Sequence, residues 1–191
     1  MRIIGGSFRG RALASVGKGD TAAHLRPTTD RVRESLFNVL LGGRYGDPIT
    51  ECRVLDLFAG TGALGLEALS RGASHVSFVE NGRKAQGLIR ENIALCQSAV
   101  HCKLIARDAT RLSQNPDAPY DLIFLDPPYA KKMGERALNA AIEGGWISQD
   151  ALVLWEESAE IAPPPDCTVL ESRKFGGTNI NFLRWQNIRT L

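Results

Sequence analysis

The sequence predicts an α/β protein built on a doubly wound, mostly parallel sheet that ends in an antiparallel hairpin. Short runs of β-forming residues alternate with segments of helical periodicity through the middle of the chain, which implies right-handed βαβ units. Residues 120–125 form a nearly continuous apolar run, as expected for a central strand covered on both faces. After three prolines at 163–165, β-rich runs at 168–174 and 180–185 flank a glycine pair and predict the hairpin.

The first half of the core alternates between strand and helix twice. Residues 53–58 are largely apolar and predict a buried strand, and a glycine-rich turn and helix follow over 60–71. Residues 75–79 predict the second strand. The next helix is predicted over 82–97, because its apolar residues recur at helical spacing: Ala85, Leu88, Ile89, Ile93 and Cys96.

The second half of the core continues this alternation. A third strand is predicted over 103–106, the fourth is the central run, and a fifth is predicted over 151–155. Between the fourth and fifth strands, residues 130–150 leave room for one helix, expected over 132–142, and its loops.

The N-terminal part of the chain is expected to be a small basic extension of one domain. We predict an extension of residues 1–50 packed on a core domain of residues 51–191. Residues 2–6 and 11–14 predict a short hairpin. A helix then begins at Thr28 or Thr29, with Asp30 in its first turn and a buried stripe of Val32, Leu36, Phe37 and Leu40.

Composition excludes several classes of protein. The 191 residues are 43% hydrophobic and 23% charged, which is typical of a globular domain with a packed core. The longest apolar stretch, 151–155, is too short to span a bilayer, and Gly5, Gly6 and Arg9 interrupt any signal peptide, so we predict a cytoplasmic protein. Four cysteines without C-x-x-C spacing and three scattered histidines predict neither a disulfide scaffold nor a metal site.

Charge is distributed unevenly along the chain. Residues 1–50 contain eight Arg or Lys against four Asp or Glu, whereas residues 51–165 contain eleven against fifteen. The basic excess favours an anionic partner held by the N-terminal segment, and a merely solvated surface is the alternative explanation.

A glycine-rich motif follows the first predicted strand. Gly60, Gly62 and Gly65 spell G-x-G-x-x-G, where glycines let the backbone approach a ligand at the start of a helix. Glu80 ends the second strand, where an acidic side chain can accept hydrogen bonds from ribose hydroxyls. These features fit either a nicotinamide dinucleotide or another adenosine cofactor.

Two further features separate these cofactors. Asp56, Phe58, Gly60 and Gly62 form an Asp-x-Phe-x-Gly-x-Gly pattern that resembles the first motif of class I S-adenosylmethionine methyltransferases. The tetrapeptide Asp126-Pro127-Pro128-Tyr129 follows the fourth strand and resembles the (D/N)-P-P-(Y/F) signature of enzymes that methylate a planar amine. A plain strand-ending turn is the alternative for this tetrapeptide.

The tetrapeptide suits amine methylation for a physical reason. An exocyclic amine is a poor nucleophile because its lone pair is delocalised into the ring. The Asp126 carboxylate and the Pro127 carbonyl can each accept one N–H, which directs the lone pair at a sulfonium methyl. Tyr129 can stack on a base pulled out of its helix.

Asp108 is a further candidate in the cofactor site. With Ala109 after it, it matches the methyltransferase position whose carboxylate contacts the adenine amino group. An N-cap of a short helix is the alternative.

Nearly the whole chain resembles the bacterial small-subunit (16S) ribosomal RNA guanine-N2 methyltransferases. Residues 3–6, 9–11, 26–34, 56–62 and 125–129 stand in the order and spacing of that family. The resemblance implies methylation of the N2 amine of one guanine by S-adenosyl-L-methionine, in 16S ribosomal RNA within an assembled or assembling subunit. Nothing in the sequence suggests an obligate dimer, so we expect a monomer. The arginines expected to contact RNA are Arg9, Arg11, Arg26, Arg31 and Arg33.

Three alternatives remain at this point. A DNA or RNA adenine-N6 methyltransferase shares the Asp-Pro-Pro-Tyr motif, a nicotinamide-dependent oxidoreductase shares the glycine motif, and a non-catalytic RNA-binding module would share the fold.

Overall fold

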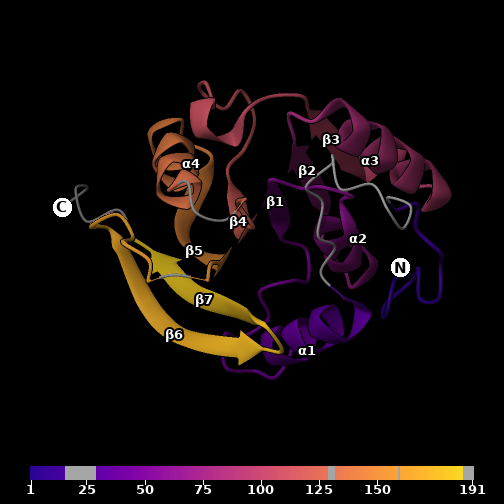
Figure 1. Cartoon of the computed structure of the whole chain (residues 1–191), viewed down its shortest axis with the longest axis horizontal. Helices are drawn as coiled ribbons and strands as arrows, with labels where there is room; N and C mark the ends of the chain where they lie inside the picture. The colour runs from indigo at the N-terminus through magenta and orange to yellow at the C-terminus, as the bar shows by residue number, and fades with distance from the viewer. Residues whose placement is uncertain (16–28, 129–131, 159, 187–191) are drawn as a thin grey trace.

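A seven-stranded sheet with the order β3-β2-β1-β4-β5-β7-β6 forms the centre of the computed structural model, which describes residues 1–15, 29–128, 132–158 and 160–186 (Figure 1). Strands β1 to β5 are parallel, and β7 is antiparallel to both β5 and β6. The predicted doubly wound sheet with a terminal hairpin is therefore confirmed. The strands are Arg53–Leu57 (β1), His75–Val79 (β2), Cys102–Ile105 (β3), Tyr120–Leu125 (β4), Ile147–Glu156 (β5), Cys167–Phe175 (β6) and Thr178–Trp185 (β7).

Helices cover both faces of the sheet. Figure 1 shows α2 and α3 on one side of the sheet, α4 on the other, and α1 beside the β6–β7 hairpin. Each face has its own apolar core, and the core on the α2 side also includes apolar residues of α1. None of the helices within the described ranges is long and apolar enough to cross a membrane. The helices are Asp30–Leu40 (α1), Ala63–Ser70 (α2), Arg83–Leu95 (α3) and Met133–Glu143 (α4), with short 3-10 turns at Ala99–His101 (η2) and Ala109–Arg111 (η3).

Strand β5 begins earlier than its sequence predicts. The apolar run starts at Ala151, yet the strand starts at Ile147 and continues through three polar residues. Ile147 pairs with Tyr120 and Leu152 pairs with Leu122, so the polar residues between them lie at a shift in the register, where Asp150 has a positive φ of 62°. The strand is longer than predicted because the buried Ile147, ahead of the polar residues, also pairs with β4.

The N-terminal segment forms less regular structure than the predicted hairpin. Arg2 and Ala12 make a single antiparallel bridge, extended by the bond from the Ile3 N–H to the Arg11 carbonyl. Helix α1 begins after Thr29, whose hydroxyl accepts from the Val32 N–H at 3.3 Å. Of the predicted stripe, Leu36, Phe37 and Leu40 are buried and Val32 is partly buried.

Glu67, a fully buried carboxylate on α2, holds the N-terminal segment against the domain. Its two oxygens accept from the N–H groups of Ile4 and Gly5, each at 2.8 Å. The Arg71 Nε lies 2.8 Å from Oε1 and the Arg33 Nε lies 3.6 Å from Oε2. This arrangement, called here the Glu67 clasp, joins residues about sixty positions apart in the chain.

Candidate active site

The glycine loop connects β1 to α2 at the carboxyl end of the sheet, the edge where doubly wound sheets bind ligands. Asp56, near the end of β1, is buried, and its Oδ2 accepts from the Gly65 N–H of α2 at 3.0 Å. A Cβ at Gly65 would lie only 2.5 Å from the Phe78 ring of β2. Only a glycine therefore allows α2 to pack this closely on the sheet.

The loop has a left-handed backbone at three successive motif positions. Phe58, Gly60 and Gly62 have φ values of 60°, 56° and 76°. Phe58 was predicted to end the strand, but its positive φ turns the chain out of the sheet. Such a conformation is uncommon in a non-glycine residue and occurs most often at turns and functional sites. Gly62 precedes α2 without supplying a capping side chain, so the helix start is formed by backbone alone.

Glu80 stands at the carboxyl end of β2 and fixes the shape of this loop. Its Oε2 accepts from the Gly60 N–H at 2.9 Å, and its Oε1 accepts from the Gly82 N–H at 2.7 Å. The carboxylate is partly exposed, and each of its oxygens keeps a second lone pair. It can therefore accept ribose hydroxyls while it holds the loop.

Asp108 follows β3 and caps the short turn η3. Its Oδ1 accepts from both the N–H and the hydroxyl of Thr110, at 2.9 and 2.8 Å. Asp108 is therefore the N-cap of a short helix, which was the alternative predicted from the sequence. Both hydrogen bonds to Thr110 are accepted by the same carboxylate oxygen. Asp108 is partly exposed and Ala109 is buried. The other carboxylate oxygen is suited to contact an adenine amino group.

These residues fit S-adenosylmethionine. A positive-φ loop provides a close backbone approach, Glu80 provides ribose acceptors, and Asp108 provides an acceptor one strand further along.

Within the described ranges, no three His, Cys, Asp or Glu side chains come together in a way that could hold a metal ion.

Asp126 begins the segment that follows β4, next to the glycine loop. Its N–H donates to the Leu57 carbonyl of β1 at 3.4 Å, which ties the two strand ends together. Burial, with the nearby carboxylates of Glu156 and Asp56, raises the pKa of Asp126 well above its ordinary value. Pro127 is buried and Pro128 is exposed. Tyr129 lies outside the described residues.

Asp56 also has a perturbed pKa. Burial raises it to about 8, the Gly65 N–H bond opposes that rise, and the charge of Glu80 adds to it. The carboxyl ends of β1 and β4 therefore carry two acids whose ionisation is costly in the absence of a cation.

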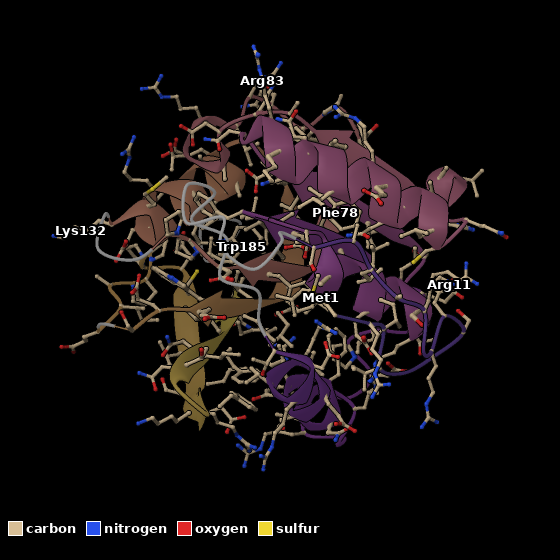
Figure 2. All side chains as sticks on the ribbon, turned by 45° about the vertical axis from the view of Figure 1, so that its right-hand side comes forward. Met1, Arg11, Phe78, Arg83, Lys132 and Trp185 are labelled. Carbon is tan, nitrogen blue, oxygen red and sulfur yellow. The ribbon has the colours of Figure 1, made fainter. Side chains whose placement is uncertain are left out.

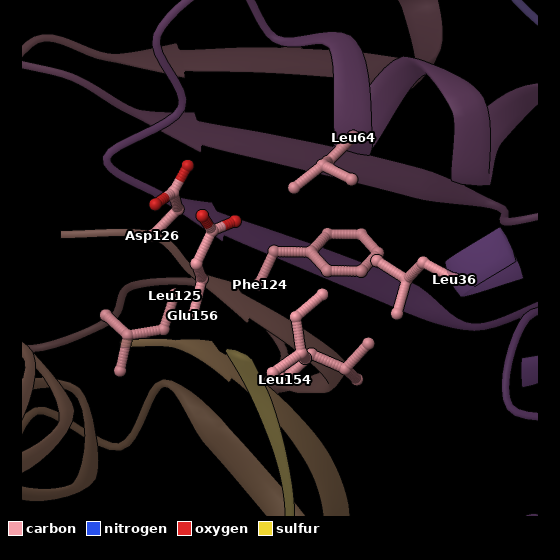
Figure 3. Close-up of a pocket in the computed structure, with 8 residues that line it drawn as sticks. Leu36, Leu64, Phe124, Leu125, Asp126, Leu154 and Glu156 are labelled. Carbon is pink, nitrogen blue, oxygen red and sulfur yellow. The ribbon is translucent and has the colours of Figure 1, made fainter. Parts of the chain in front are cut away.

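Glu156 is a site residue that the sequence analysis missed. Together with Asp126 it provides the polar part of a pocket whose other walls are apolar (Figure 3). The available signal was that Glu156 directly follows the apolar run of β5, just as Asp126 follows that of β4. The pocket is lined by Leu36, Leu64, Phe124, Leu125, Asp126, Leu154, Glu156 and Ile180.

Asn92, a buried residue of α3, is a second residue that was missed. Its amide nitrogen donates to the Thr61 carbonyl in the glycine loop at 2.9 Å. The same side chain accepts from the Ala14 N–H at 2.7 Å and donates to the Ala14 carbonyl at 3.1 Å. One amide therefore joins the glycine loop to the N-terminal segment.

The predicted RNA-contacting arginines differ in their exposure. Arg9 and Arg31 are exposed. Arg11 is partly buried at the end of α3, where its guanidinium donates to the Leu95 carbonyl (Figure 2). Arg26 lies outside the described residues.

The prediction for Arg33 was wrong. Its side chain is fully buried, where it pairs with Asp30 and Glu67. A phosphate cannot reach this guanidinium without unfolding the segment above it, so its role is to hold the clasp.

The sequence profile of a protein family described as "Conserved hypothetical protein 95" matches residues 1–184. The chain is 36% identical over 164 residues to Ribosomal RNA small subunit methyltransferase D of Escherichia coli (strain K12), covering 86% of this chain and 78% of that protein. It is 33% identical over 181 residues to the protein of the same name from Haemophilus influenzae, covering 92% and 89%.

Solved structures agree with this assignment. The structure of yhhF from Escherichia coli superposes with a TM-score of 0.79 at 33% identity, covering 97% of this chain and 98% of that one. An RNA methyltransferase from Salinibacter ruber in complex with S-adenosyl-L-homocysteine has the same fold, with a TM-score of 0.66 at 12% identity over 85% and 95% of the two chains. The resemblance to small-subunit ribosomal RNA methyltransferases is thus confirmed, and the chain belongs to the Conserved hypothetical protein 95 family.

Proposed function

We propose that this protein transfers a methyl group from S-adenosylmethionine to the exocyclic N2 amine of one guanine in small-subunit ribosomal RNA, in the cytoplasm. The named relatives act on ribosomal RNA of the small subunit, which supports this class of substrate. The observation that carries the proposal is the position of Asp126 and Pro127, at the end of β4 and beside the glycine loop.

The glycine loop, Glu80 and Asp108 would hold the donor along the carboxyl ends of β1 to β3. When bound, the donor supplies an electrophilic methyl group on a positively charged sulfur. The Asp126 carboxylate and the Pro127 carbonyl would accept the two N–H groups of the target amine, which keeps the lone pair of the nitrogen out of the ring. Because Pro127 has no N–H, this stretch of backbone offers the amine an acceptor without a competing donor.

The raised pKa of Asp126 suits a second task. Once the amine nitrogen has gained a methyl group it must lose a proton, and a carboxylate with a raised pKa accepts a proton more readily than an ordinary surface aspartate. Asp126 would thus first orient the amine and then receive its proton.

The test is nucleoside mass spectrometry of small-subunit ribosomal RNA from cells with and without the gene, combined with methylation of the unmodified RNA by the purified protein. We expect N2-methylguanosine to be lost with the gene and restored in the reaction. Loss of N6-methyladenosine instead would favour the adenine enzyme. Unchanged RNA, or calorimetric binding of a reduced nicotinamide dinucleotide without binding of S-adenosylmethionine, would overturn the proposal.

A further inference from the structure

The pocket beside Asp126 combines apolar walls with two acceptors. Among the residues that the structure describes, six apolar side chains line it, and the charged groups are the carboxylates of Asp126 and Glu156 (Figure 3). Such a pocket suits a planar, largely apolar ligand that presents hydrogen-bond donors at one edge. An exposed base of an RNA has this character.

The sheet register brings the two carboxylates together. In the parallel pairing of β4 with β5, Leu125 is opposite Trp155, so the residues that follow, Asp126 and Glu156, extend from neighbouring strand ends. Adjacent strands are about 4.8 Å apart, so the side chains of Asp126 and Glu156 can converge from the two strand ends on the edge of one base. The Thr178 hydroxyl of β7 donates to Glu156 Oε1 at 3.2 Å and fixes its orientation.

The donor pattern of guanine matches this pair of acceptors. Guanine presents its N1–H directly beside its N2 amine, whereas adenine presents an acceptor, N1, beside its N6 amine. A carboxylate next to the one that holds the amine therefore attracts guanine and repels adenine.

We propose that Glu156 accepts the N1–H of the target guanine while Asp126 holds its N2 amine, an inference that rests on the proposed function. Glu156 is then a specificity-determining residue: it selects guanine and disfavours any base with an acceptor at that position. The two carboxylates lie near each other, and a guanine supplies a donor to each.

The test uses 2-aminopurine, which has the exocyclic amine of guanine but an acceptor at N1. Once the methylated position has been mapped, ribosomal RNA carrying guanine or 2-aminopurine there is assayed with the full chain. We expect the parent to prefer guanine by about a hundredfold or more in kcat/KM, because a site built for a donor rejects an analogue without it.

The Glu156→Gln variant keeps the size of the side chain and the acceptor for Thr178, and its amide can donate to N1 of 2-aminopurine. We expect its preference for guanine to fall at least tenfold. The Glu156→Asp variant retains the carboxylate, so it should lose rate with both bases but keep the preference. Glu157→Gln, which removes a neighbouring charge, should leave the ratio unchanged.

The outcomes separate this inference from the proposed function. If the parent methylates no guanine, the proposed function has failed. If the parent methylates guanine and Glu156→Gln keeps the parental ratio, the inference is overturned. If the Glu156→Gln variant transfers no methyl group, the dissociation constants of the two RNAs are measured instead. Binding of the 2-aminopurine RNA is followed by its fluorescence, and binding of the guanine RNA by competition. An unchanged ratio of the two constants would overturn the inference in the same way.

Discussion

The Glu67 clasp predicts a large loss of stability from a change of very few atoms. Glu67→Gln keeps the shape of the side chain and replaces one carboxylate oxygen by an NH₂ group. In the parent, each carboxylate oxygen faces a backbone N–H and a guanidinium nitrogen. Oε1 faces Gly5 and Arg71. Oε2 faces Ile4 and Arg33. In either orientation, the new NH₂ group therefore points at donors.

Two costs follow from this geometry. One buried N–H loses its acceptor, and the fully buried Arg33 loses its buried carboxylate partner while it keeps the partly exposed Asp30. Breaking a buried ion pair by removing one partner costs about 3–5 kcal/mol. Since about 2–4 °C of melting temperature corresponds to each kcal/mol in a chain of this size, we expect the Tm to fall by about 6–20 °C.

The assay is thermal unfolding followed by far-UV circular dichroism, with urea titration for the free energy. Glu91→Gln is the matched control, because Glu91 is exposed on α3, and such surface changes stay within about 0.5 kcal/mol. Hydrogen exchange at the Ile4 and Gly5 amides should accelerate in Glu67→Gln alone. A Tm within about 1 °C of the parent would refute the clasp as a stabilising element.

Three further predictions concern the active site and its RNA. Asp126→Ala should lower the methylation rate by about a hundredfold or more with donor affinity nearly unchanged, measured by single-turnover assay and calorimetry; equal rates would exclude Asp126 from the mechanism. Replacing Arg9 and Arg31 by Gln should lower the salt slope of RNA binding by about two, whereas an unchanged slope would exclude phosphate contacts. The pKa of Asp56 is raised to about 8, so the folded chain retains a proton that the unfolded chain releases above a pH of about 4. The free energy of unfolding should therefore decrease as the pH rises from about 4 through 8. Asp56→Asn should flatten this decline in urea titrations between pH 5 and 8; parallel curves for variant and parent would contradict the raised pKa.

The order of elements could be predicted because apolar runs and helical spacing follow directly from burial. Residues 120–125 were identified with the bounds that β4 has, since a strand covered on both faces is apolar throughout. The early start of β5 could not be found in this way, because its polar residues 148–150 lie at a shift in the register with β4 and carry no apolar signal.

The buried polar residues were harder to predict than the apolar ones. Arg33 lies three, four and seven residues before Leu36, Phe37 and Leu40, so helical spacing already placed it on the buried stripe of α1. Its charge suggested an exposed position, and only the buried carboxylate of Glu67, distant in sequence, makes its burial favourable.

Glu156 needed tertiary information of another kind. Its place at the end of an apolar run was visible, but its proximity to Asp126 depends on β4 and β5 being neighbours in the sheet, which the sequence does not state.

The three hydrogen bonds of Asn92 have an evolutionary consequence. An aspartate at this position could not donate to the Thr61 or Ala14 carbonyls, a leucine would leave three main-chain groups without partners, and a glutamine is one methylene too long. Substitution therefore requires a simultaneous change in the glycine loop and in the segment at Ala14. We expect natural selection to retain asparagine here, although neither the donor nor the RNA needs to touch it.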